Sequence, residues 1–191
     1  SNLGIIGKAS FRNTNIESIK IPENVIEIHE EAFSDCKELY SFEFEGKPKM
    51  KKIEANFLAR DSLNELTIPA SVVELKDGWL NRSLVRKIDL AEGNQMYKVF
   101  EDKYIIGKTN SESDDYDKIV YTKIELDKIE IPLFISIISG VYSHRVESIT
   151  IPDHVTVIGA YSFASCFSLK KVEISENSKL RIIGSNAFQN R

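Results

Sequence analysis

Triplets in which a polar residue stands between two apolar residues recur along the chain at nearly even intervals. β-Branched and aromatic residues fill most of the apolar positions, which is typical of a strand with one buried face. Proline directly follows four of the triplets and ends the strand ladder there, because proline has no N–H to donate. We therefore predict one short strand at each of these places: Ile19-Lys-Ile21, Phe42-Glu-Phe44, Leu66-Thr-Ile68, Ile88-Asp-Leu90, Ile129-Glu-Ile131, Ile149-Thr-Ile151 and Val172-Glu-Ile174.

A second pattern separates the triplets: an apolar residue is followed five positions later by another one, as in Ile28 and Phe33. From the first of these anchors to the end of the next triplet the distance is 15 or 16 residues in five units. Units of 20 to 24 residues cannot bury their apolar face alone, whereas stacked units share a continuous core. The spacing predicts an α/β repeat solenoid, wound right-handed, with one parallel strand per coil at about 4.8 Å spacing. The Ala-Phe stretch of each unit, such as Ala32-Phe33, is predicted to form a short helical turn on the outer side.

The pattern breaks once, between Leu90 and Ile129, where about forty residues replace the roughly twenty-three of one coil. Two alternating apolar runs flank a polar segment from Lys108 to Asp117, which predicts a β-hairpin inserted at about residues 94–128. We expect the hairpin to project from the stack and to be dispensable for folding. Its tip, from Ser111, is predicted to be a disordered acidic loop, because the run lacks the ligand spacing of a calcium loop.

No linker rich in proline, glycine or serine divides the chain, so we predict one solenoid over residues 1–191. The chain starts and stops inside a coil, and no signal peptide opens it. A coil at the end of a solenoid needs a polar cap, or it exposes core residues to water. We therefore expect a longer parent protein, and a chain that is monomeric when dilute but associates weakly end to end.

The repeat unit is clearest from Ile151-Pro152 through Val155, Ile158, Gly159, Phe163, Cys166 and Leu169. This pattern resembles the leucine-rich repeats of the BspA-like surface proteins, and the resemblance covers nearly the whole chain. Asn94, Tyr97 and Val99 also resemble an insert of related proteins. The resemblance implies a leucine-rich-repeat stack on a cell surface or in a secreted protein. It also implies a role as an adhesin or surface antigen, since such proteins occur on anaerobic bacteria and some parasitic protists.

Composition and charge narrow the classes of partner. The chain is 42% hydrophobic and 28% charged, which suits a folded core with an ordinary surface. Its net charge of −4 weighs against nucleic acid, because phosphate binding needs a cationic stripe. The one basic cluster, Lys49, Lys51 and Lys52, is predicted to be a solvated loop. No stretch approaches the roughly 20 apolar residues that span a membrane. A protein or a host-surface ligand is the expected partner.

Residues that could carry chemistry are few and scattered. His29, His144 and His154 occupy unrelated positions of different coils, and no serine or cysteine stands in a nucleophile motif, so we predict no enzyme, metal or cofactor. Cys36 and Cys166 take the same place in distant repeats, which puts them too far apart for a disulfide and predicts small buried residues. Asn81-Arg-Ser83 matches a glycosylation acceptor, and an ordinary loop is the alternative interpretation.

The middle residue of each triplet must point away from the core, because side chains alternate along a strand. These residues form the predicted ligand-binding row of the strand face: Lys20, Glu43, Thr67, Asp89, Glu130, Thr150 and Glu173. Neither this row nor the neighbouring row, formed by the residues directly before each triplet, contains an aromatic residue. We therefore expect a polar or cationic ligand that binds weakly and with an affinity that falls as salt rises.

Three functions fit this surface. The first is a cell-surface protein-binding or adhesion module that uses the strand face. The alternatives are a structural spacer or stalk without a ligand and, less favoured, an intracellular scaffold.

Overall fold

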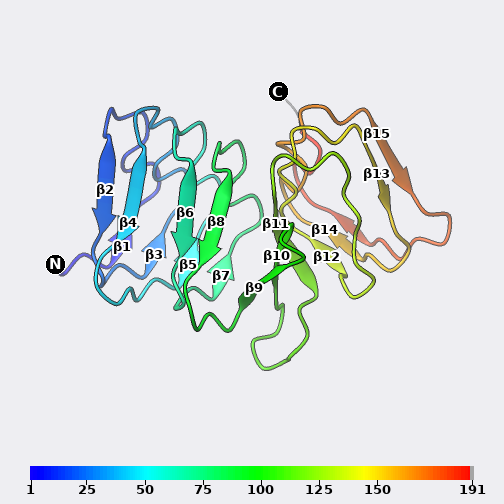
Figure 1. Ribbon diagram of the computed structural model, residues 1–191, viewed down its shortest axis with the longest axis horizontal. Coiled ribbons are helices and arrows are strands. Elements are labelled where there is room, and N and C mark those ends of the chain that lie inside the picture. The colour runs from blue at the N-terminus through cyan, green and yellow to red at the C-terminus, as the bar shows by residue number, and fades with distance from the viewer. Residues whose placement is uncertain (190–191) are drawn as a thin grey trace. The chain divides into compact units, whose positions relative to one another are not determined.

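The computed structural model describes residues 1–189 and divides into two compact units. Unit 1 comprises Ser1–Met96, and unit 2 begins at Tyr97 (Figure 1). Each unit consists of short strands joined by turns. The expectation of one continuous solenoid over the whole chain stays a prediction.

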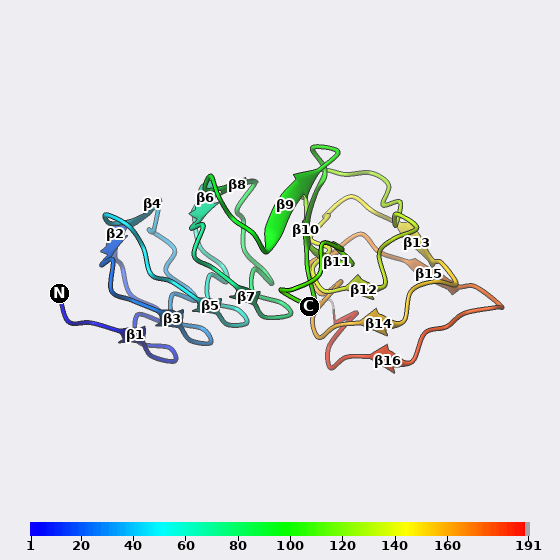
Figure 2. The same ribbon diagram turned by 90° about the horizontal axis from the view of Figure 1, so that it is seen from below.

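Unit 1 has two layers of parallel strands with the core between them (Figure 2). One layer is a four-stranded sheet of two-residue strands in the order β1 (Ile5–Ile6), β3 (Glu27–Ile28), β5 (Lys52–Ile53) and β7 (Glu74–Leu75). The other layer holds the predicted triplets: β2 (Ser18–Ile21) pairs with β4 (Ser41–Phe44), and β6 (Glu65–Ile68) pairs with β8 (Lys87–Leu90). Phe33, Leu39, Phe57 and Trp79 are buried between the layers. The prediction of stacked coils with parallel strands is confirmed, but the prediction of one strand per coil is wrong, because the two-residue strands add a second strand to the coils.

Unit 2 repeats this arrangement after an antiparallel start. Its larger sheet has the order β16 (Ile182–Ile183), β14 (Val157–Ile158), β12 (Ile137–Ile138), β11 (Lys118–Thr122), β10 (Tyr104–Gly107) and β9 (Tyr97–Phe100). Strands β9, β10 and β11 pair antiparallel, whereas β11, β12, β14 and β16 pair parallel. The second layer is β13 (Ser148–Ile151) paired with β15 (Lys171–Ile174).

The predicted hairpin exists, but the expectation that it projects from the stack is wrong for its strands. β11 pairs with β10 on one side and with β12 on the other, so it also forms the first parallel strand of unit 2. Tyr104, Ile106 and Ile119 belong to the same core cluster as Ile138 and Phe163. All four residues of β10 are buried. In a projecting hairpin, alternate residues of the strand would face solvent.

Local contacts join residues at the base of the hairpin tip, and the expected disorder of the tip stays a prediction. Asp117 accepts bonds from the backbone amide and the hydroxyl of Thr109, at 3.0 and 2.6 Å. The Nζ atoms of Lys98 and Lys108 lie 4.0 and 5.1 Å from the ring centroid of Tyr116, so the aromatic ring attracts both cations.

The predicted helical turns are wrong: residues 1–189 contain strands and turns but no helix. In the stretch after His29, alternate backbone amides bond to the next coil instead of to their own turn. The amides of Glu31, Phe33 and Asp35 donate to the carbonyls of Ala55, Phe57 and Ala59 at 3.3, 2.9 and 2.7 Å. A helix would need each of these amides to bond four residues back. Glu31 and Asp35 also take left-handed backbone angles, with φ of 57° and 60°, which a right-handed helix excludes.

The triplet strands do not form one continuous sheet. Six of the seven predicted triplets lie in strands, but Ile129, Glu130 and Ile131 belong to no strand. In unit 1 no ladder joins β4 to β6, and in unit 2 β13 pairs only with β15. The ladder between coils is therefore interrupted once on the triplet side of each unit, while the opposite sheet of unit 1 is continuous from β1 to β7.

Candidate functional site

The predicted row of the strand face lies in register within each unit. Lys20 is the partner of Glu43, Thr67 of Asp89, and Thr150 of Glu173. Six of the seven residues are exposed and Asp89 is half-buried, as expected from the alternation of side chains along a strand. Glu130 is exposed as well, although its backbone is in no strand. The structure thus pairs Lys20 with Glu43 and Thr67 with Asp89 in unit 1, and Thr150 with Glu173 in unit 2.

The carboxylates of this row are paired with neighbouring lysines. The Nζ–O distances are 3.2 Å for Lys20–Glu43, 2.6 Å for Lys87–Asp89, 2.6 Å for Lys128–Glu130 and 2.6 Å for Lys171–Glu173. The hydrogen bond from Lys171 lowers the pKa of Glu173, and that from Lys128 lowers the pKa of Glu130. Exposed pairs of this kind add little stability. Their effect on recognition is larger, because the strand face presents alternating charges and not the net acidic surface that its central row suggests.

A groove of about 600 Å³ opens on the strand face of unit 1, where the ladder between β4 and β6 is missing. We call it the unit 1 groove. Glu43 and Thr67 of the predicted row line it, together with Phe42, Phe44, Gly46, Lys47, Pro48, Pro69, Ala70, Ser71 and Ala91. The sequence reasoning missed the aromatic contribution, because Phe42 and Phe44 occupy the inward positions of their triplet. The longer interval around Gly46 and Pro48, 24 residues from Ser41 to Glu65 against 22 from Glu65 to Lys87, is the signal that could have found it.

A second groove, of about 840 Å³, opens in unit 2 between residues 127–131 and β13. Glu130 and Thr150 of the predicted row line this unit 2 groove. Its charged lining residues are Asp127, Lys128, Glu130, Glu147 and Asp153, and its apolar ones are Ile129, Ile131, Ile149 and Pro152. In both units a groove therefore lies at the interruption of the strand ladder.

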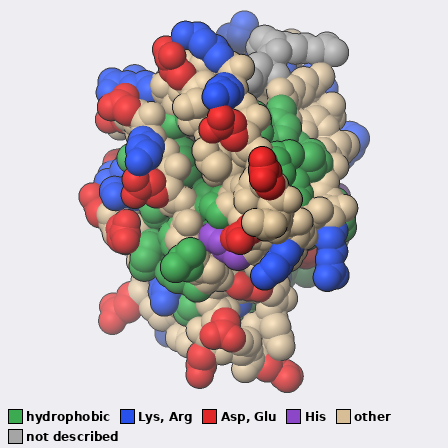
Figure 3. Space-filling view, turned by 90° about the vertical axis from the view of Figure 1, so that its right-hand side faces the viewer, with side chains coloured by type: hydrophobic (Ala, Val, Ile, Leu, Met, Phe, Trp, Pro, Cys, Tyr) green, Lys and Arg blue, Asp and Glu red, His purple; other side chains and the backbone are tan. Residues whose placement is uncertain are grey.

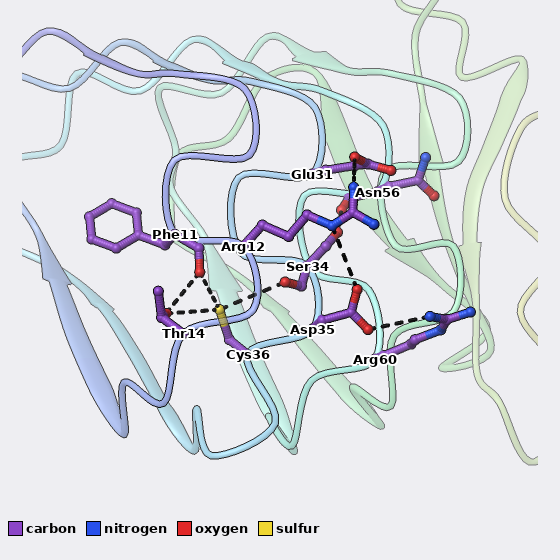
Figure 4. Close-up of polar contacts among 9 residues, drawn as sticks. All are labelled: Phe11, Arg12, Thr14, Glu31, Ser34, Asp35, Cys36, Asn56 and Arg60. Atoms are coloured by element: carbon purple, nitrogen blue, oxygen red, sulfur yellow. Dashed lines mark hydrogen bonds and ion pairs between the residues drawn. The ribbon is translucent and has the colours of Figure 1, made fainter.

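In the turns that follow β1, β3 and β5, polar side chains link one coil to the next (Figure 4). Arg12 pairs with Glu31 at 2.7 Å and lies 3.8 Å from Asp35, which also contacts Arg60 at 3.4 Å. The thiol of Cys36 donates to the carbonyl of Phe11 at 3.0 Å. These ion pairs and hydrogen bonds join successive coils, so the side chains that form them have a structural role.

The two cysteines are buried, as predicted, and neither forms a disulfide. Burial raises the pKa of Cys166 to about 12. A thiol with so high a pKa is almost entirely protonated at neutral pH and is a poor nucleophile.

Buried polar side chains also bond one coil to the next in the turns between β5 and β8. Asp61 is 2% exposed; its carboxylate accepts bonds from Ser83 Oγ and the amide of Leu63, both at 2.8 Å. Burial raises the pKa of Asp61. Asn81, the candidate glycosylation acceptor, is only 4% exposed, and its Nδ2 donates to Asn56 Oδ1 at 2.8 Å. The nitrogen that would carry a glycan is therefore buried and bonded in the folded chain.

The histidines are half-buried and have separate environments. His29 Nε2 lies 3.0 Å from a carboxylate oxygen of Glu27, and His154 Nε2 lies 3.1 Å from the carbonyl of Pro132. The ring of His144 packs against Phe167. Over residues 1–189, no three His, Cys, Asp or Glu side chains gather as a metal site would require. The same residues include no helix that is long and apolar enough to cross a membrane.

Comparisons with known proteins place this geometry in a family. The model of the BspA type leucine-rich repeat region matches the chain in six copies, over residues 1–113 and 136–191. The residues between these ranges include all of β11, the strand that follows the hairpin tip. No curated protein matches the chain.

Solved structures with the same fold are longer than this chain. The pneumococcal vaccine antigen PcpA is 20% identical, with a TM-score of 0.76 over 93% of this chain and 44% of its own. A leucine-rich cell surface protein from Faecalibacterium prausnitzii A2-165 is 19% identical, with a TM-score of 0.67 over 92% of this chain and 52% of its own. A leucine-rich repeat protein from Eubacterium ventriosum is 20% identical, with a TM-score of 0.60 over 96% and 60%. At such identities the likeness shows the fold alone.

Proposed function

The chain belongs to the BspA-type leucine-rich repeat family, and on that premise we propose that it is a protein-binding or adhesion module of a cell surface. In each unit its recognition surface is the strand face with the groove beside it, formed around Lys20, Glu43, Thr67 and Asp89 in unit 1 and around Glu130, Thr150 and Glu173 in unit 2. Repeat solenoids commonly bind partners along such an extended surface.

One observation carries the proposal: each unit has a groove on the side of the predicted row, at the interruption of the ladder. The unit 1 groove contains Glu43 and Thr67, and the unit 2 groove contains Glu130 and Thr150. Grooves of several hundred Å³ are of the size that accepts ligand groups or partner side chains. On the opposite side of unit 1 the sheet from β1 to β7 is closed by continuous ladders. A spacer without a ligand needs neither an open strand face nor its grooves.

We also propose a location at the cell surface or outside the cell. One structural relative is described as a vaccine antigen and another as a cell surface protein. Those descriptions support a similar location for this chain. We also propose that the chain has no catalytic role, because the histidines contact different partners and the family is one of repeat proteins.

The alternating charges of the strand face set the expected strength of binding. A ligand that contacts the lysine–carboxylate pairs must compete with them, so we expect weak binding that salt reduces further. The grooves supply apolar contacts that salt does not screen. A partner that engages a groove should therefore keep part of its affinity at high ionic strength.

Binding of the purified chain to immobilised matrix proteins and epithelial cell surfaces tests the function. Thr67→Arg and Thr150→Arg place a bulky cation in the middle of the strand face of each unit. Val73→Arg is the matched control, because Val73 is exposed but lies directly before β7 in the opposite sheet of unit 1. We expect the two face variants to lose binding and the control to retain it. Equal binding by all variants, or no binding to any surface tested, would favour the spacer alternative.

We also propose weak self-association through the last and first coils. Val172, Ile174, Ile182 and Ile183 are between 37% and 55% exposed. At the other end of the described chain, Leu3 and Ile5 are 45% and 49% exposed. Figure 3 shows hydrophobic side chains that reach the surface between charged ones. Exposed apolar groups that cluster in this way are typical of contact sites.

A further inference from the structure

We infer that Pro69 and Pro152 hold the two grooves open, and that they are therefore positioning residues of the recognition surface. Each of these prolines directly follows a triplet and lines the groove of its unit. The inference rests on the proposed function, because it identifies what keeps the strand face of each unit from closing.

The residue that follows a triplet separates the coils that pair from those that do not. Among triplets that follow one another within a unit, three pairs are joined by a ladder: β2 with β4, β6 with β8, and β13 with β15 (Figure 1). In these pairs the residue after the second triplet is Glu45, Ala91 or Ser175. Where no ladder joins a triplet to the preceding one, that residue is Pro69 or Pro152.

The physical difference is the backbone N–H that a coil offers to the preceding coil at the end of its triplet. In the paired coils this amide donates to the last carbonyl of the preceding triplet. The donors are Glu45, Ala91 and Ser175, at 2.9, 2.9 and 3.3 Å. Pro69 stands at the same place opposite Phe44, and Pro152 opposite Ile131, but proline has no N–H and its ring carbon takes the place of the hydrogen. The bond that would close the ladder cannot form, and the ring keeps the two chains apart.

A proline at this place blocks pairing in one direction only. In a parallel ladder, the backbone groups of successive residues point alternately to the two neighbouring strands. The carbonyl of Ile68, directly before Pro69, accepts from Ala91 of the following coil, so β6 pairs with β8 but not with β4. β13, directly before Pro152, likewise pairs with β15 alone. Each of these prolines therefore begins a new two-stranded sheet.

The same rule accounts for the triplet that forms no strand. Residues 129–131 are followed by Pro132, and Pro152 follows the triplet of the next coil. Pairing is thus blocked on both sides of this triplet. The carbonyl of Glu130 accepts instead from the side-chain hydroxyl of Tyr104, at 3.0 Å. The triplet therefore lines the unit 2 groove as irregular backbone.

The interval between coils does not by itself open a ladder. In the sheets of two-residue strands, pairing spans 20 residues between positions 137 and 157 and 25 residues between positions 27 and 52. The open ladders fall within this range, at 24 residues between positions 41 and 65 and 20 between positions 129 and 149. No proline directly follows any of the two-residue strands.

Amide hydrogen exchange of the whole chain, measured by NMR, tests whether the prolines open the ladders. The amides of Glu65 and Thr67 point toward β4, because the residues that alternate with them bond to the coil of β8. Pro69→Ala supplies the missing N–H. We expect a ladder between β4 and β6 in which both amides exchange at least about tenfold more slowly than in the wild type. Pro152→Ala should have the same effect on the amides of β13 that face the unit 2 groove.

A reciprocal variant and a matched control complete this test. Glu45→Pro removes the N–H that closes β4 onto β2, so the amides of Ser41 and Glu43 should exchange at least about tenfold faster. Pro22→Ala is the control, because Pro22 follows the first triplet of residues 1–189 and no described triplet precedes it. It should leave the exchange of β2 and β4 unchanged.

Surface binding distinguishes positioning of the recognition surface from a role in folding alone. The double variant with Pro69→Ala and Pro152→Ala closes both grooves without placing a larger side chain in either. We expect it to lose binding to the matrix proteins and epithelial surfaces, whereas Pro22→Ala retains binding. Its melting temperature should stay within a few degrees of the wild type, because the new ladder bonds offset the loss of proline rigidity. Lost binding then cannot be attributed to unfolding.

Two results would overturn the inference. One is that Glu65 and Thr67 exchange as fast in Pro69→Ala as in the wild type, or that Ser41 and Glu43 stay protected in Glu45→Pro. The other is that both grooves close in the double variant while surface binding is unchanged. The exchange measurements need no ligand. A failure of the proposed function, seen as no binding by the wild type, is therefore distinguishable from a failure of the prolines to open the ladders.

Discussion

Replacing Ile119 by alanine tests whether the inserted hairpin is part of the core of unit 2. Ile119 is 0% exposed in β11, and Ile106 and Ile138 in the flanking strands are 0% exposed as well. Replacement removes three buried carbon atoms from a site closed by strands on both sides. Isoleucine-to-alanine changes in packed cores cost about 2–5 kcal/mol. We expect a value near the middle, about 3 kcal/mol, because paired strands limit how far the site can collapse.

The loss of stability is measured as the change in the free energy of unfolding, by urea titration followed by circular dichroism. Ile138→Ala is the matched core variant from an ordinary coil and should cost about as much. Replacement of the tip from Thr109 to Asp117 by a short glycine-containing turn is the surface control. We expect it to cost well under 1 kcal/mol beyond the loss of the Asp117 bonds, because exposed loops tolerate such changes.

The comparison can refute the reasoning in two ways. If Ile119→Ala costs less than about 0.5 kcal/mol, the hairpin strands are not part of the cooperative core. If the tip replacement costs as much as Ile119→Ala, the polar tip itself supports the fold. Either outcome would mean that burial and strand pairing do not report the stability of this segment.

Three further predictions concern other parts of the chain. Burial raises the pKa of Asp61, so the folded state binds the carboxyl proton more tightly than the unfolded state does. The contribution of Asp61 to the free energy of unfolding of the wild type therefore falls as pH rises. The stability of Asp61→Asn relative to wild type should therefore grow from about pH 3 to about pH 7 in thermal melts, and a difference independent of pH would contradict the assignment. Asn81 should carry no glycan in folded chain secreted from a eukaryotic host, as mass spectrometry against Asn81→Gln can show, and a folded glycosylated chain would contradict its burial. Light scattering should detect weak association only at high concentration, and Ile5→Asp or Ile182→Asp should abolish it; association untouched by both changes would exclude the end coils as the contact.

Six of the triplet strands could be predicted because their signal is local. Alternation of apolar and polar residues decides which face of a strand is buried, and the following proline decides where its ladder ends. The triplets at Lys20 and Thr150 therefore lie where the pattern places them, with their middle residues exposed. The even spacing of the anchors similarly predicted the stacking of coils, because a single unit cannot bury its own apolar face.

The helical turns and the projecting hairpin were predicted wrongly because their outcome depends on distant partners. Ala32-Phe33 has a locally helical composition, but the amide of Phe33 bonds to the next coil, and that bond competes with a helix. The hairpin strands look like an independent insertion in sequence. Pairing of β11 with β12 makes them part of the stack, and the sequence does not show that pairing.

The sequence by itself determined the family, the repeat, the positions of six triplet strands and the row of side chains that faces solvent. Only the tertiary structure decided that Asn81 and Asp61 are buried, that lysines balance the acidic row, and that a groove opens beside Phe44. The physical reason is that these features depend on the separation and pairing of neighbouring coils. All coils follow nearly the same local pattern, and residues about 22 to 25 positions apart in sequence contact each other in adjacent coils. Small differences between coils therefore decide where two neighbouring strands pair and where a groove separates them.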